Sequence, residues 1–276
     1  MQRRTGFFLL FLGFSLSSIG QAQNPPARSS PASASGQVEV APPIKRVPPP
    51  SPGLSAEELT DRGDELRAEK NYLDALDYYH AATAKKPNDA SIWNRLGIAE
   101  LLLQRWKDSR KDLERAIRAD HAFADAYNNV GVVDYQQKKY GRAIREYQAA
   151  IRLRPDEAPY YSNLGAAYFS RKDFENAALA YGQALQLDPD IFEHSSRNGV
   201  AAQLPSPEDR AHYDYVMAKL YAKAGANDRS LEHLKRAMEE GYKKIDEVYT
   251  DKEFTDLRRD PRFTQLMAAR PTAIPE

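Results

Sequence analysis

The 276-residue sequence contains no cysteine. Disulfide bonds, a thiolate nucleophile, cysteine-ligated zinc and a lipid-modified N-terminal cysteine are therefore excluded. The chain also has no excess charge of either sign, because 39 Lys and Arg residues balance 39 Asp and Glu residues. A nucleic-acid-binding surface needs a concentration of basic residues, so we expect no nucleic-acid partner.

Recognisable catalytic motifs are lacking as well. The chain has no G-x-S-x-G motif, no phosphate-binding glycine loop and no dinucleotide fingerprint. The histidines lack the i, i+4 pairing and the carboxylate neighbours of a metal site; they are His80, His121, His194, His212 and His233. His194 and Ser195 are adjacent, and adjacent residues rarely form a nucleophile and its base. We therefore expect no enzyme activity, catalytic residue, cofactor or metal.

A long apolar run occurs only near the N-terminus. Arg3 and Arg4 precede an apolar stretch over residues 7–19, and small residues flank Ala22. This order is typical of a secretory signal peptide over residues 1–22, and the run is shorter than the roughly 20 residues that span a bilayer. We expect an exported, periplasmic or secreted protein, cleaved after Ala22 and left without a stable membrane span. An uncleaved anchor is the alternative.

Residues 23–54 are rich in Pro, Ala and Ser and include Pro48, Pro49 and Pro50. This composition cannot bury a core and favours an extended, disordered linker. A proline-rich recognition motif is the alternative interpretation.

The rest of the chain repeats itself every 34 residues. Four glycines are spaced at this interval: Gly63, Gly97, Gly131 and Gly165. Four alanines repeat it: Ala82, Ala116, Ala150 and Ala184. A third series consists of Pro87, Pro155 and Pro189, with His121 at the position where a proline is missing. Apolar residues between them recur at steps of three and four, which indicates α-helices. Short polar breaks, such as residues 137–139, predict antiparallel helical hairpins.

This pattern resembles the tetratricopeptide repeat, in which glycine and alanine let helices approach and aromatic residues such as Tyr147 fill the space between them. The resemblance implies an all-α, right-handed α-solenoid of antiparallel helical hairpins. We expect four clear units over residues 55–189, an insertion over residues 190–210, a degenerate fifth unit over residues 211–245 and C-terminal capping helices with a tail over residues 246–276. The fifth unit follows from aligning Ala218 with the glycine series.

Helix-capping signals mark both ends of this region. Ser55 with Glu58 has the spacing of a capping box at the first helix. Thr250 with Glu253 has the same spacing, and Asp260 followed by proline predicts a cap and a first-turn proline. We expect one or two short helices to close the stack at its C-terminal end.

The resemblance also implies a binding groove, because the first helix of each hairpin lines the concave side of such solenoids. Its expected lining is Asn94, Ile98, Asn128, Asn129, Val132, Tyr135, Asn163 and Phe169. Asparagine can pair with a peptide backbone, while Tyr135 and Phe169 would contact apolar side chains of a peptide. The alternative is that these asparagines serve the repeat itself.

Acidic C-terminal tails are not expected ligands, since Thr60 and Asp64 stand where a carboxylate-binding repeat would carry basic residues. We expect a non-catalytic protein–protein interaction scaffold of the bacterial envelope that binds a peptide or protein segment in the groove. The alternative is an assembly subunit that uses the convex face, the insertion or the cap. Partner identity and oligomeric state stay open at this stage.

Overall fold

The computed structural model describes residues 46–192 and 206–270, and within these ranges its regular structure is helical, with no strand. Eight helices form four consecutive hairpins. They are α1 (Ala56–Ala68) with α2 (Tyr72–Lys85), α3 (Ala90–Leu102) with α4 (Trp106–Ala119), α5 (Ala124–Gln136) with α6 (Tyr140–Leu153), and α7 (Ala158–Ser170) with α8 (Phe174–Leu187). The four predicted units are thus confirmed as helical hairpins.

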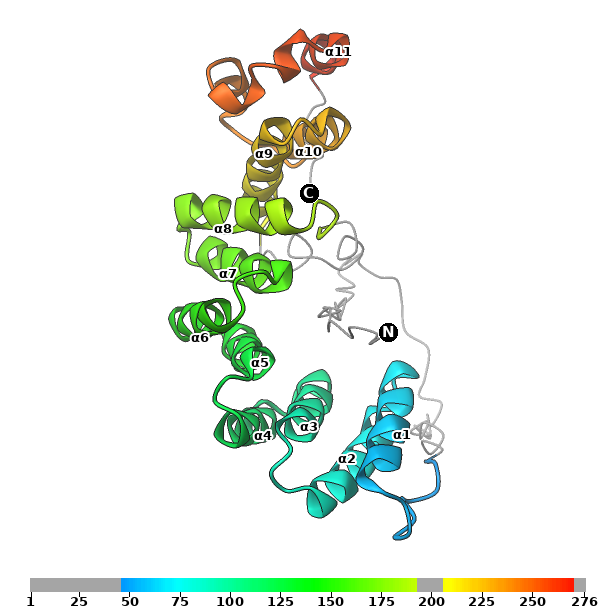
Figure 1. Cartoon of the computed structure of the whole chain (residues 1–276). Coiled ribbons are helices and arrows are strands. Elements are labelled where there is room, and N and C mark those ends of the chain that lie inside the picture. The colour runs from blue at the N-terminus through cyan, green and yellow to red at the C-terminus, as the bar shows by residue number, and fades with distance from the viewer. Residues whose placement is uncertain (1–45, 193–205, 271–276) are drawn as a thin grey trace, which may run out of the picture.

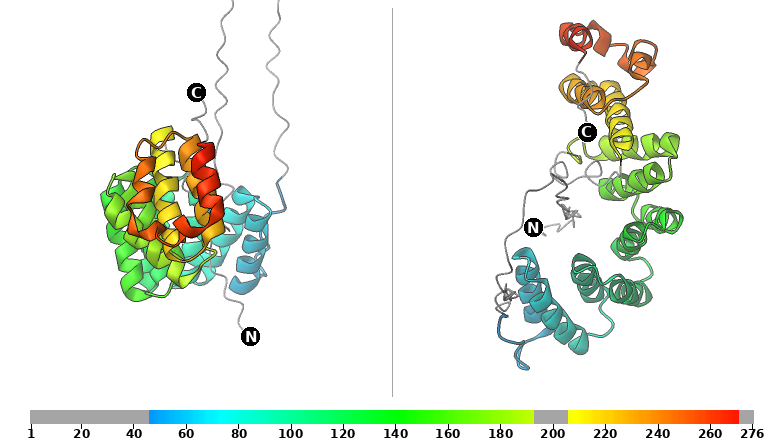
Figure 2. Two further views of the ribbon diagram at one scale, coloured as in Figure 1. Left: turned by 90° about the horizontal axis from the view of Figure 1, so that it is seen from above. Right: turned by 180° about the vertical axis from the view of Figure 1, so that it is seen from behind.

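The hairpins stack into an arc, with α3 and α5 on its inner side and α4 and α6 on its outer side (Figure 1). The view from behind shows the N-terminal hairpin and the C-terminal helices at the two ends of this arc (Figure 2). The predicted all-α solenoid of antiparallel hairpins is confirmed. The first helices of the units therefore occupy the side on which a ligand site was expected.

Close packing within each hairpin depends on the repeated glycine. A Cβ atom added at Gly165 would lie 2.5 Å from the ring of Tyr181, and one added at Gly131 would lie 2.6 Å from the ring of Tyr147. Carbon atoms in contact normally lie about 3.5–4.0 Å apart. The glycine series therefore exists because a large side chain of the second helix lies directly on the first; it is a tyrosine ring in three units and Leu113 in the second.

The turns inside the hairpins share one backbone feature. A residue with positive φ recurs every 34 residues, at Lys70, Gln104, Lys138 and Lys172, with φ between 59° and 64°. Gly225, with φ 75°, stands at the corresponding turn of the next hairpin. This left-handed residue ends the first helix and reverses the chain, which explains why two or three polar residues suffice for the connection.

A fifth hairpin follows, made of α9 (Pro207–Lys223) and α10 (Asn227–Glu239). Ser230 Oγ donates to the carbonyl of Ala218 at 2.8 Å, just as Ser109 Oγ donates to the carbonyl of Gly97 at 2.7 Å. Because both pairs are 12 residues apart, the alignment of Ala218 with the glycine series is supported. The hairpin begins at Pro207, four residues before its expected start.

The C-terminal cap consists of three 3₁₀ helices and one α-helix: η2 (Ile245–Tyr249), η3 (Lys252–Phe254), η4 (Leu257–Arg259) and α11 (Pro261–Ala269). The capping box of Ser55 and Glu58 is confirmed, and Asp260 caps α11 as expected. The box expected at Thr250 and Glu253 is wrong. Thr250 Oγ1 instead donates to the carbonyl of Glu247, since Thr250 ends η2 rather than beginning a helix.

The folded region begins before residue 55. Tyr78 Oη donates to the carbonyl of Pro48 at 3.1 Å, and Lys85 Nζ donates to that of Pro52 at 3.0 Å. Arg46 forms ion pairs with Asp74 and Asp77. Residues 46–54, expected in the linker, therefore pack along α2.

Several expectations lie outside the described residues. They are the signal peptide over residues 1–22, the linker up to residue 45, the insertion residues 193–205 with His194 and Ser195, and the tail over residues 271–276. Among the helices that are described, none is long and apolar enough to cross a bilayer.

Candidate interaction surface

Four asparagine side chains form a continuous hydrogen-bonded row on the first helices of three repeats. Asn163 Nδ2 of α7 donates to Asn128 Oδ1 of α5 at 2.9 Å, and Asn129 Nδ2 of α5 donates to Asn94 Oδ1 of α3 at 2.9 Å. Asn128 Nδ2 donates to Asn129 Oδ1 at 3.4 Å. Each amide thus bonds to the next, and the row crosses from α7 to α3.

The repeat places these residues together. Both hydrogen bonds between helices join residues 35 apart, which is one more than the repeat length. Each donor asparagine therefore bonds to the residue just before its own equivalent in the previous repeat. The row ends at Asn94 because Arg95 occupies the position of Asn129 in the second unit and pairs with Asp64, while Thr60 occupies the position of Asn94 in the first unit and donates to the carbonyl of Ala56. The row therefore has a structural role in joining neighbouring repeats.

All eight predicted groove residues are buried. The four asparagines are 5–9% exposed, and Ile98, Val132, Tyr135 and Phe169 are 0–9% exposed. Their role in peptide binding stays a prediction, with corrections for Phe169 and Tyr135. Phe169 lies in the core against Phe174 and Tyr213, with ring centroids 4.9 and 5.8 Å apart, so it is not free to contact a ligand.

Tyr135 needs the same correction. Its hydroxyl forms a 3.0 Å hydrogen bond with Ser170 Oγ, and its ring lies 5.3 Å from that of Tyr140. The expectation that it contacts apolar side chains of a peptide is not met, because its ring and its hydroxyl are both occupied by packing between α5 and its neighbours. Sequence spacing identified its helix face but not how closely the next repeat covers it.

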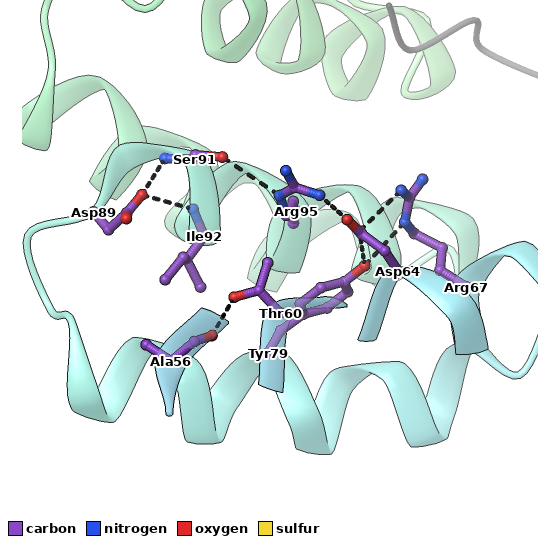
Figure 3. A network of polar contacts seen from close by, with 9 residues as sticks. All are labelled: Ala56, Thr60, Asp64, Arg67, Tyr79, Asp89, Ser91, Ile92 and Arg95. Carbon is purple, nitrogen blue, oxygen red and sulfur yellow. Dashed lines mark hydrogen bonds and ion pairs between the residues drawn. The ribbon is translucent and has the colours of Figure 1, made fainter. Parts of the chain in front are cut away.

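Asp64 of α1 stands at the centre of a polar network with Arg67, Tyr79 and Arg95 (Figure 3). Tyr79 Oη donates to Asp64 Oδ1 at 2.6 Å, and Arg67 Nη2 donates to the same oxygen at 3.1 Å. Arg95 of α3 pairs with the other carboxylate oxygen. Asp64 was expected to disfavour an anionic ligand. In the structure it also pairs with the guanidinium groups of Arg67 and Arg95, which could otherwise bind an anionic ligand.

Two acidic residues at equivalent repeat positions are buried in different surroundings. Burial, followed by the negative charge of Asp112, raises the pKa of Glu100 to about 8. Asp134, 34 residues later, is fully buried and accepts a 2.8 Å hydrogen bond from Arg110. Burial raises the pKa of Asp134 as well, while the Arg110 charge opposes that rise. Glu100 is thus expected to carry a proton near neutral pH.

A cavity of about 900 Å³ opens between α8 and α9 and was not anticipated from the sequence. Its apolar lining includes Phe174, Leu179, Val216 and Leu220, and residues 241–253 contribute part of its wall. The signal that could have found it is the loss of charged residues along α8, where only Glu175 is charged.

The histidines need one correction. His233 Nδ1 lies 2.7 Å from Asp214 Oδ1, so this histidine does have a carboxylate neighbour. The two residues come from α10 and α9, and their sequence separation of 19 concealed the contact. Among the described residues, no group of three or more His, Asp or Glu side chains is arranged to hold a metal ion.

Comparison with protein families agrees with this architecture. Profiles described as tetratricopeptide repeat match residues 60–125 and 158–191, and one described as TPR repeat matches residues 131–170. The chain is a tetratricopeptide repeat protein. Together the profiles cover most of the four hairpins built by α1 to α8. No curated protein sequence matches the chain.

Solved structures with similar folds include three tetratricopeptide proteins at low identity. MamA from Desulfovibrio magneticus RS-1, from residue 41 to its end, is 19% identical over 68% of this chain and 96% of its own, with a TM-score of 0.48. TTC0263 from Thermus thermophilus is 20% identical over 78% and 100%, with a TM-score of 0.48. The second such domain of human RPAP3, solved with an HSP70 peptide, is 22% identical over 42% and 98%, with a TM-score of 0.40.

Proposed function

We propose that this tetratricopeptide repeat protein is a non-catalytic interaction scaffold that holds a peptide segment of a partner protein against the inner side of its arc. The observation that carries the proposal is the row of four asparagine amides across α3, α5 and α7. An amide side chain offers an acceptor and two donors, which are the groups that a peptide backbone can pair with.

The asparagine row has a direction and two ends. Within the part of the chain that the structure describes, neither Asn163 Oδ1 nor Asn94 Nδ2 has a hydrogen bond, and the two residues are 9% and 7% exposed. A backbone N–H of a bound peptide can donate to Asn163, and a backbone C=O can accept from Asn94. Hydrogen bonds in series polarise one another, so the row strengthens the group at each end.

Photocrosslinking tests this use of the inner side. Ser91 lies three residues before Asn94 on α3, and Ser162 of α7 has the repeat position of Asn94 and Asn128; both serines are half-buried. A photoreactive amino acid at either serine should crosslink one and the same partner in extracts of the source cell. The matched controls are Lys111 and Arg145, which are exposed on α4 and α6.

The opposite result favours the alternative function. If crosslinks form at Lys111 and Arg145 and not at Ser91 and Ser162, the partner binds the convex face. The protein would then be an assembly subunit rather than a peptide-binding scaffold.

We further propose that the protein is exported and acts in the bacterial envelope, in the periplasm or after secretion. The support is the order of charged, apolar and small residues in residues 1–22, followed by a proline-rich segment suited to a tether. Mass spectrometry of the protein from fractionated cells should find a mature chain that begins at Gln23. A chain in the cytosol that still begins at Met1 would contradict export.

A further inference from the structure

The outer surface of α8 differs from those of the equivalent helices. Leu179 stands where α4 and α6 have Lys111 and Arg145, and it is 68% exposed. Similarly, Gly182 replaces the polar Glu114 and Gln148, and Gln186 replaces Arg118 and Arg152; these residues occupy the same repeat positions. Leu179 thus leaves the outer surface of α8 without the positive charge that α4 and α6 carry at this position.

This neutral surface forms one wall of the 900 Å³ cavity. In the preceding repeat, Gln148 of α6 donates to Tyr168 Oη of α7 at 3.1 Å, so a long side chain bridges the two helices there. Gly182 cannot form this bridge, and a Cβ atom on it would lie 3.5 Å from Leu220 of α9. The cavity therefore lies at a position that a bridging side chain fills between α6 and α7.

The length of the cavity follows from its contacts. Phe174 and His212, near the starts of α8 and α9, have ring centroids 3.8 Å apart, and Gly182 faces Leu220 further along both helices. These two contacts place residues of both helices along the same stretch of the cavity. Its α8 lining extends from Phe174 to Gln186, about 18 Å of helix. A helix of about 12 residues has this length.

Charges at the two ends give the site a polarity. Lys219, Lys243 and Lys244 already pair with acidic residues. Glu175 and Lys223 also line the cavity and have no ion pair within the described residues; Glu175 lies in the first turn of α8 and Lys223 in the last turn of α9. The N-terminus of an α-helix is positive and its C-terminus negative. A bound helix is therefore complementary when it begins beside Glu175 and ends beside Lys223.

We propose that this cavity binds a short amphipathic α-helix of a partner protein, with its apolar face on Leu179, Gly182 and Leu220. The site is separate from the inner-side asparagine row and does not depend on it. Helix-in-groove recognition needs an apolar groove and anchoring side chains at helical spacing, and the α8–α9 cavity supplies the groove. A terminal acidic residue beside Lys223 would strengthen the complex.

The test uses a fluorescent, hydrocarbon-stapled 12-residue helix with leucines at positions 2, 5, 6 and 9, titrated into the full chain and followed by anisotropy. Leu179→Lys introduces the positive charge that α4 and α6 carry at this exposed position, and it should weaken binding about tenfold. Arg145→Ala, at the same repeat position of α6, should leave affinity unchanged. A peptide of the same composition with scrambled leucines should not bind.

A second pair of peptides tests the polarity. An acidic residue at the C-terminal end should increase affinity, and the gain should disappear in Lys223→Ala; the same residue at the N-terminal end should reduce affinity. Equal binding by the wild type and Leu179→Lys would overturn the proposal. So would a concentration-dependent dimer that Leu179→Lys abolishes in sedimentation experiments, because the occupant would then be a second copy of this chain.

Discussion

Asn163 on α7 donates a 2.9 Å hydrogen bond to Asn128 on α5, joining two repeats through buried amides. Asn128 in turn donates to Asn129, so loss of the Asn128 side chain leaves Asn163 Nδ2 and Asn129 Oδ1 without their hydrogen-bond partners. The asparagine row therefore contributes to stability in addition to any binding role.

Asn128→Ala should lower the free energy of unfolding by about 1–3 kcal/mol, the usual effect of leaving a buried polar group without its partner. Urea denaturation followed by circular dichroism measures this change. Asn88→Ala, at an exposed position in a loop, is the control and should change stability very little. Equal effects of the two substitutions would show that the row does not couple the repeats.

Gly165→Ala should be strongly destabilising, because the new methyl group would lie 2.5 Å from a ring carbon of Tyr181. Relieving that overlap separates α7 from α8, and overpacking of a core typically costs about 1–3 kcal/mol. Gly141→Ala is the matched control, since no atom lies within 4 Å of the added carbon. Thermal melts should show a lower Tm for Gly165→Ala alone.

The hairpins and their close packing could be predicted from the sequence, whereas the burial of Phe169 could not. The glycine and aromatic positions recur at one interval, so the hairpins and their close packing could be read from spacing. The burial of Phe169 depends on His212 and Tyr213, which lie in α9, beyond the end of the regular repeat. Spacing within a unit does not contain that information.

The α8–α9 cavity could not be predicted for a related reason. It requires Phe174 to approach His212 across 38 residues, in a part of the chain where the 34-residue interval no longer applies. The loss of charge at Leu179 was visible in the sequence, but only the position of α9 turns that loss into a cavity.

Stability should fall as the pH rises through the folded-state pKa of Glu100, which is about 8 against an ordinary value of 4.5. Between these values the folded chain holds a proton that the unfolded chain releases, so this contribution is complete below about pH 4.5 and is lost above about pH 8. Glu100→Gln should flatten the dependence in urea titrations from about pH 5 to about pH 9. Glu175→Gln, at an exposed position, should leave the slope unchanged.

Asp64→Asn should create affinity for an acidic peptide, because it releases Arg67 and Arg95 from the carboxylate that now occupies them. A synthetic peptide with acidic residues and a free C-terminal carboxylate is the probe, measured by calorimetry. We expect about a tenfold gain over the wild type, which corresponds to one charge-assisted hydrogen bond of about 1.5 kcal/mol. Asp61→Asn makes the same change in net charge one turn earlier and should give a smaller gain.

Backbone recognition by the asparagine row is the central claim, and it is tested most directly on the peptide segment that crosslinks to Ser91 and Ser162. Synthetic copies carrying either single alanine substitutions or single backbone N-methyl groups are titrated into the full chain. The account predicts that N-methylation at one or two positions abolishes binding, while most alanine substitutions change affinity little. Loss of binding on alanine substitution with tolerance of N-methylation would contradict it.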